Sequence, residues 1–230
     1  MSEELYKIFT PRWTLGFVIC ELKKMGRYTG PKNRLARREG IDLGLKTVGT
    51  KTHANLLKRL GIPPGMHGSK GKRRVSDFGE QLREKQRVKR LYGLLERQFR
   101  RIYGRARKQL GNTGEKLLES LERRLDNTLF RLGLGPTRAA SRQFVTHGHV
   151  LVNGKKVTIP SYEVAVHDVI TLGTKGLEIP AVKKLIDSPL EVIPEWLERK
   201  GPVGNVVRLP VRSDIKEDIN EQLIIEHYSR

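Results

Sequence analysis

The sequence has little of what secreted or membrane-spanning proteins require. Only one of its 230 residues, Cys20, is a cysteine, so no disulfide framework can form and a reducing compartment fits. No run approaches the ~18 consecutive apolar residues that a membrane helix needs. The short apolar run at 13–20 follows two glutamates and lacks the basic flank of a secretory signal, so we expect no such signal. Hydrophobic residues make up 37% of the chain, below the ~45–50% (glycine included) of ordinary globular proteins, which predicts a modest core.

Acidic residues are scarce in one part of the chain. The net charge is +20, and residues 25–110 hold 24 Lys/Arg against only 6 Asp/Glu. A charge run is usually a solvated helix face, but here most basic residues have no glutamate one turn away to balance them. The asymmetry therefore favours a polyanionic partner, and in particular a nucleic acid bound in a salt-dependent way.

Residues 115–132 have the spacing of one amphipathic helix that Gly133 ends. One side of this helix would carry the leucines at 117, 118, 121, 125, 129 and 132. The opposite side would carry four polar residues, Arg123, Arg124, Asn127 and Arg131. Because these residues face away from the core, we expect them to reach phosphate oxygens and base edges.

A second helix is predicted from Thr137, a good N-cap residue, to Gly148. Its residues Arg138 and Arg142 are one turn apart and share a face. An Asn153-Gly154 pair between two apolar runs then predicts a tight hairpin, because both central residues need positive φ. Residues 168–172 read as a third strand. The unit is thus two helices on a small antiparallel sheet, with cations on one surface.

Six short motifs in this stretch resemble a known RNA-binding module. They are RLDN at 124–127, RLG at 131–133, Arg138 with Arg142-Gln143, HGH at 147–149, VNGK at 152–155 and IPSY at 159–162. The module is the one named after ribosomal protein four of the bacterial small subunit, also called the αL motif. Several kinds of protein carry it, so the module alone does not decide the function.

The flanking sequence resembles the family of that ribosomal protein itself, over about residues 25–230. The matching stretches, in the expected order, are 26–40, 63–68, 76–101 and 207–230. The resemblance implies a structural constituent of the small ribosomal subunit, ribosome-bound in the cytoplasm. It also implies early binding to a junction in the 5′ domain of small-subunit ribosomal RNA, which nucleates assembly of the subunit body. Further implied partners are messenger RNA, at the channel through which it enters, and ribosomal protein five, at a surface that affects translational accuracy.

The expected fold class is α+β, a mainly helical basic domain with the small module inserted in it. We expect a basic arm and helical domain at 25–114, the module at 115–182, and a segment at 183–230 that packs back on the helices. Residues 1–24 match nothing in the family, and are either a lineage-specific extension or precede a true start at Met25. In the tail, we expect Trp196 to be buried and the acidic residues of 214–221 to be available to a neighbouring protein.

Residues 76–110 are predicted to be helical, with Asp77 and Glu80 forming a capping box. Apolar residues from Phe78 to position 102 keep three-to-four spacing. Two aromatic residues there, Tyr92 and Phe99, could stack on bases, but aromatics at helical spacing are more often core. The prolines and glycines of 63–68 predict a rigid turn, which together with His67 and the basic residues of 70–74 makes a basic loop. By the resemblance this loop touches ribosomal RNA.

No metal or other cofactor is expected. Some family members bind zinc through four cysteines in the arm, but the first two positions here are Asn33 and Ala36, and His53 alone cannot replace the ligands. No residue is predicted to be catalytic. The predicted RNA-binding residues are Arg27, Lys32, Arg34, Arg37, Arg38, His67, Lys70, Lys72, Arg73, Arg74, Arg83, Arg87, Arg90, Arg97, Arg124, Arg131, Arg138, Arg142, Gln143, His147, Lys155 and Lys156.

Two other functions compete with the ribosomal one. Pseudouridine synthases and tyrosyl-transfer-RNA synthetases carry the same module, but each needs a separate catalytic domain for which this chain has no spare segment. A regulator that binds messenger RNA, or a ribosome-rescue factor, is the second alternative. Family members do repress their own operon, and the sequence does not separate that role from the ribosomal one.

Overall fold

The computed structural model describes residues 28–70, 74–187 and 193–229, and it has the predicted α+β fold. The extension at 1–24 and three predicted RNA-binding residues, Arg27, Lys72 and Arg73, lie outside the described residues. Within the described ranges, no helix is both long and apolar enough to cross a membrane.

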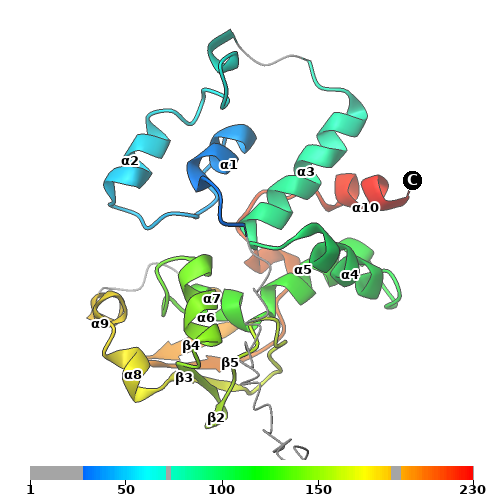
Figure 1. The fold of residues 1–230 in the computed structure, drawn as a ribbon. Coiled ribbons are helices and arrows are strands. Elements are labelled where there is room, and N and C mark those ends of the chain that lie inside the picture. Colours follow the sequence, from blue (N-terminus) through cyan, green and yellow to red (C-terminus); the bar gives the residue numbers. More distant parts are fainter. Residues whose placement is uncertain (1–27, 71–73, 188–192, 230) are drawn as a thin grey trace, which may run out of the picture.

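The helical part has a core of its own, to which the C-terminal helix contributes (Figure 1). In this core α10 packs against α3 and α5, and α1 contacts α2 and α3. The fully buried side chains include Val88, Phe99, Leu117 and Ile224. The elements are α1 (Lys32–Glu39), α2 (Lys51–Leu57), η1 (Gly68–Lys70), α3 (Asp77–Leu91), α4 (Glu96–Ala106), α5 (Thr113–Glu122), η2 (Arg212–Asp214) and α10 (Glu221–Ser229).

The sheet part is a five-stranded antiparallel sheet in the order β2-β1-β3-β5-β4, with α6 and α7 packed on it. The hairpin is confirmed, since Asn153 and Gly154 have φ of 50° and 76°. At Gly204 the sheet approaches α6 so closely that a Cβ would lie 2.4 Å from Leu132. The elements are α6 (Leu125–Arg131), α7 (Arg138–Thr146), β1 (Val150–Val152), β2 (Lys155–Lys156), β3 (Val169–Leu172), α8 (Thr174–Leu177), α9 (Pro180–Asp187), β4 (Leu197–Lys200) and β5 (Val203–Val206).

The single helix predicted for 115–132 is wrong, because α5 ends at Glu122 and α6 begins at Leu125. Between them Arg124 has extended backbone (ψ 133°) and pairs with Glu163 in an isolated bridge. The predicted leucine stripe is consequently divided. Its first three leucines are buried in the helical core, and its last three are buried in the sheet core.

The helix predicted from residue 76 is also interrupted. Gly93, with φ of 64°, separates α3 from α4. The N-cap is Ser76, whose hydroxyl accepts a bond of 3.3 Å from the Gly79 amide, so the predicted box of Asp77 and Glu80 is wrong. Tyr92 and Phe99 are buried, so these two aromatics are core residues and do not present their rings for base stacking. Phe78, which was expected on the apolar side, is half exposed.

The sheet extends beyond the boundary predicted at 182. Strands β4 and β5 complete it, and Trp196 is buried in its core as predicted. The chain then returns to the helical core through Ile215, Ile219 and α10. The segment 183–230 therefore contributes to both parts, because a β-hairpin and a helix find their partners in different cores.

Candidate nucleic-acid interface

The arginines of α6 and α7 are held by carboxylates inside the chain. Arg131 donates bonds of 3.0 and 2.8 Å to Glu122 and of 2.7 Å to Glu217. Arg138 donates bonds of 2.8 Å to Glu217 and of 2.8 Å to the Asn127 side chain. These guanidinium groups point toward the helical part, so the predicted placement of Arg131 and Asn127 on an outward side is wrong.

Glu122 is the centre of this cluster, with a side chain that is only 1% exposed. Besides Arg131, its carboxylate accepts bonds of 2.8 Å from Asn127 and of 2.6 Å from the Tyr92 hydroxyl. Burial, helped by the Glu122 charge, raises the pKa of Tyr92 well above its ordinary value, so this hydroxyl remains a donor. Burial alone would raise the pKa of Glu217, but the charges of its two arginine partners lower it to about 2.

A second internal cluster explains the RLDN motif. Arg124 donates bonds of 3.1 and 2.8 Å to Asp126, and its side chain is only 6% exposed. Arg142 lies 3.5 Å from the same carboxylate. Arg124 and Arg142 are therefore ion-paired within the module, contrary to the expectation that Arg124 faces outward.

Several of the predicted RNA-binding residues of the module are exposed where the end of α7 meets the hairpin. The exposed residues there are Gln143, His147, Lys155 and Lys156. Gly148 brings the two segments together, because a Cβ on it would lie 2.0 Å from the Lys156 side chain. The His147 and His149 rings are stacked with their centroids 6.1 Å apart. We call this surface the hairpin edge.

In the arm, Arg37 has a structural role that the sequence did not indicate. It donates bonds of 3.0 and 3.2 Å to the carbonyls of Ile62 and Pro63, and so holds the Pro-Pro turn against α1. Gly68 closes the turn, since a Cβ there would lie 1.9 Å from the Pro63 oxygen. Five other predicted residues of the arm and its loop are exposed, namely Arg34, Arg38, His67, Lys70 and Arg74, whereas Lys32 is half-buried.

The basic residues of α3 and those of α4 differ in their surroundings. Arg83 and Arg90 share Glu39, and Arg87 pairs with Glu84. Burial raises the pKa of Glu39, partly offset by the charges of Arg90 and Arg83.

On α4, Arg97 and two arginines that the predicted set omits, Arg100 and Arg101, are exposed. Together with Glu96 they line a shallow hollow of about 590 Å³. None of the three is ion-paired with a carboxylate of the described residues. We call them the α4 arginines. Helical spacing would have found Arg100 and Arg101, since they lie one turn from Arg97.

Comparison with known proteins decides the family. Residues 27–122 match the model of the ribosomal protein S4/S9 N-terminal domain, and residues 123–170 match that of the S4 domain. The small ribosomal subunit protein uS4 of Trichlorobacter lovleyi is 49% identical over 209 residues, which are 90% of this chain and 100% of that protein. That of Clostridium tetani is 50% identical over 208 residues, again 90% and 100%. The chain belongs to the uS4 family.

The predicted resemblance to this ribosomal family is therefore confirmed. The two uS4 family models meet between residues 122 and 123, which is also where α5 ends. The limit of the S4 domain thus coincides with the division between the two cores at the α5–α6 break.

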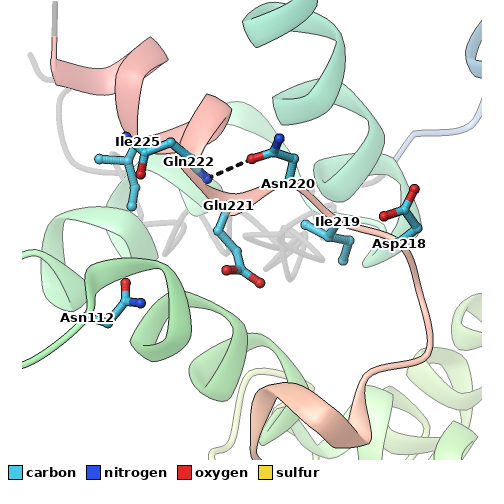
Figure 2. Close-up of a pocket in the computed structure, with 7 residues that line it drawn as sticks. All are labelled: Asn112, Asp218, Ile219, Asn220, Glu221, Gln222 and Ile225. Atoms are coloured by element: carbon cyan, nitrogen blue, oxygen red, sulfur yellow. Dashed lines mark hydrogen bonds between the residues drawn. The ribbon is translucent and has the colours of Figure 1, made fainter.

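The acidic tail of this uS4 chain is less available than predicted. Asp214 is bound by Arg208, Glu217 by Arg131 and Arg138, and Glu221 by Arg212. The fourth acidic residue of 214–221, Asp218, is exposed. It borders a polar hollow of about 310 Å³ whose other lining residues are Asn112, Ile219, Asn220, Glu221, Gln222 and Ile225 (Figure 2).

Two residues considered as zinc ligands in the arm, Asn33 and His53, make hydrogen bonds within the protein. Asn33 donates a bond of 3.0 Å to the Thr52 carbonyl, and His53 is 2.7 Å from Asp42. These contacts tie α1 to α2 and α2 to the loop before it. Among the described residues, no group of three or more His, Cys, Asp or Glu side chains is placed to hold a metal ion.

Proposed function

We propose that this uS4 family member is a structural, non-catalytic constituent of the small ribosomal subunit in the cytoplasm. It binds a junction in the 5′ domain of small-subunit ribosomal RNA early in assembly and thereby nucleates the subunit body. In the assembled subunit it lies beside the channel through which messenger RNA enters, and it contributes to translational accuracy. The similarity to uS4 proteins over 90% of the chain supports the ribosomal part of this proposal.

The observation that carries the RNA-binding proposal is the segregation of free cations from paired ones. The exposed cations of the predicted RNA-binding set lie in the arm and its loop, on α4 and at the hairpin edge, while the arginines around Glu122 and Asp126 are neutralised internally. Because A-form RNA hides its major-groove edges, cations on separate surfaces suit recognition of junction shape through phosphates. Of the predicted RNA-binding set, we therefore assign phosphate contacts to Arg34, Arg38, His67, Lys70, Arg74, Arg97, Gln143, His147, Lys155 and Lys156.

The proposal is tested by measuring affinity for the 5′ domain of small-subunit ribosomal RNA across a range of salt. An unrelated structured RNA of equal length is the control. We expect strong preference for the ribosomal RNA, and affinity for both RNAs to fall as salt rises. Equal affinity for the two RNAs at every salt concentration would contradict the ribosomal proposal.

For a protein contact, the Asp218 hollow is the surface that we assign to ribosomal protein five. Its exposed carboxylate suits a basic neighbour. The change Asp218→Asn should weaken binding of the purified neighbour and leave RNA affinity unchanged. An unchanged affinity for ribosomal protein five would show that this protein binds at another surface.

A further inference from the structure

A cleft between α1 and α3 has the size and walls of a small-ligand site. Its volume is about 360 Å³, within the range of about 300–1,000 Å³ that is usual for such sites. The lining residues are Tyr28, Arg34, Leu35, Arg38, Leu82, Arg83, Gln86 and Arg90. They combine cations, an aromatic ring, two leucines and one amide in a single concave surface.

The charge of the cleft suits an anion. The carboxylate of Glu39, which pairs with two of the lining arginines, is only 3% exposed and is engaged by Arg90 and, at 3.9 Å, by Arg83. Arg34 and Arg38 lie one helical turn apart on α1, so they face the same side. Both are exposed, and neither is ion-paired with a carboxylate of the described residues. Two guanidinium groups are therefore available to phosphate oxygens.

The apolar part of the cleft suits a base. Tyr28 is 45% exposed, yet its ring lies over Gly30 so closely that a Cβ there would be 2.5 Å from the Tyr28 hydroxyl oxygen. The absence of a side chain at Gly30 thus lets the ring lie against the backbone. Leu35 and Leu82 are half buried beside it, and the Gln86 amide offers both a donor and an acceptor.

We propose that this cleft receives one unstacked nucleotide of the bound RNA. The base packs against Tyr28 and the two leucines, and its phosphate binds Arg34 and Arg38. A duplex keeps its bases stacked inside and would offer phosphates alone, whereas an unpaired nucleotide offers both parts. The inference rests on the proposed RNA-binding function, and it adds Tyr28 to the site.

The test compares the full chain with Tyr28→Ala and Tyr28→Phe in binding to the 5′-domain RNA and to the unrelated structured RNA. The Tyr28→Ala variant loses one base–aromatic stack, so its RNA affinity should be about 5- to 150-fold lower than that of the unaltered chain. Its salt dependence should be unchanged, because no charge is removed. Tyr28→Phe keeps the ring and should bind within about twofold of the unaltered chain. Arg34→Gln with Arg38→Gln should instead lower the salt slope by about 0.7 for each single-strand phosphate that is no longer bound.

Two further measurements separate folding from binding. Melting of Tyr28→Ala should match that of the unaltered chain, because the ring is half exposed and belongs to neither hydrophobic core. Gly30→Ala removes no group that contacts RNA but displaces the ring, so it should also weaken binding. The inference is wrong if Tyr28→Ala binds RNA as tightly as the unaltered chain. It is also wrong if Tyr28→Phe loses as much RNA affinity as Tyr28→Ala loses.

The inference and the proposed function can fail separately. Should the unaltered chain prefer the ribosomal RNA while Tyr28→Ala has no effect, only the cleft is refuted. Should the unaltered chain bind both RNAs equally, the ribosomal proposal fails. The cleft is then still decided by whether Tyr28→Ala weakens binding to each of them.

Discussion

Two groups of arginines look alike in the sequence and differ in what surrounds them. Those of α6 and α7, together with Arg124, have side chains only 6–13% exposed and are paired with Glu122, Asp126 or Glu217. The α4 arginines are exposed and have no such partner among the described residues. A buried guanidinium without a carboxylate would be costly, so the acids of the first group are part of its fold. The difference teaches that a basic residue is available to a polyanion only where tertiary structure brings no carboxylate to it.

The most severe way to break the paired group is Glu122→Gln. This change leaves Arg131 with one carboxylate fewer in a buried site, and we expect a loss of about 3–5 kcal/mol in the free energy of unfolding. Denaturant melts of both proteins measure it. The matched control is Glu198→Gln, which removes a half-exposed partner of Lys200 and should cost about 0–1 kcal/mol. Similar costs for the two changes would show that the Glu122 cluster is not needed for stability.

A smaller and pH-dependent loss is expected for Glu217→Gln, about 1–3 kcal/mol at pH 7. The folded pKa of Glu217, about 2, lies below its ordinary 4.5. The carboxylate therefore stabilises the fold fully above about pH 4.5, and this contribution is lost as pH falls toward 2. The difference in unfolding free energy between the two proteins should accordingly be constant from pH 7 to 5 and shrink below that. A difference that grows on acidification would contradict the assignment.

The salt dependence of RNA binding distinguishes the two groups of arginines, and the expected effect is smaller than the stability changes above. Arg100→Gln with Arg101→Gln should lower the log–log salt slope by about 0.7–0.9 for each phosphate that the variant no longer binds, with melting unchanged. The contrasting pair, Arg138→Gln with Arg142→Gln, should lower stability and leave the slope as it was. If the second pair reduces the slope and the first does not, the roles assigned to the two groups are reversed.

The smallest effect is expected from a single substitution at the hairpin edge, measured as a change in the salt slope of RNA binding. Lys156→Gln removes one exposed charge, so it should lower the salt slope by about 0.7–0.9 and leave the melting temperature unchanged. Isothermal titration at two salt concentrations, with a thermal melt of each protein, measures both. A change in melting without a change in slope would give Lys156 a structural role against Gly148.

Local features were predictable from the sequence because their causes are local. The Asn153-Gly154 hairpin and the Thr137 N-cap depend on neighbouring backbone geometry, and both are confirmed. The buried side chains of Trp196 and Phe99 followed from apolar character and spacing. The motifs also led to the right family without any knowledge of the contacts that they make.

The pairing of the arginines could not be predicted, because its partners are distant. Glu217 is 86 residues from Arg131 and 79 from Arg138, so no helical spacing points to it. The α5–α6 break was missed for a related reason. The leucine period continues unbroken through 123–124, and only the existence of two cores explains why the chain turns there. A hydrophobic stripe shows which residues are buried but not how many cores they enter.

The α5–α6 break has a consequence for the spacing of RNA contacts. The arm and the α4 arginines belong to one core and the hairpin edge to the other, and the Glu122 and Glu217 clusters fasten the two together. These clusters therefore set the distance between two cationic surfaces, one on each side of the α5–α6 break. Under the proposed function, we therefore expect an RNA whose two segments are separated by another distance to bind one of these surfaces but not both, so that a junction is selected by its dimensions as well as by its charge.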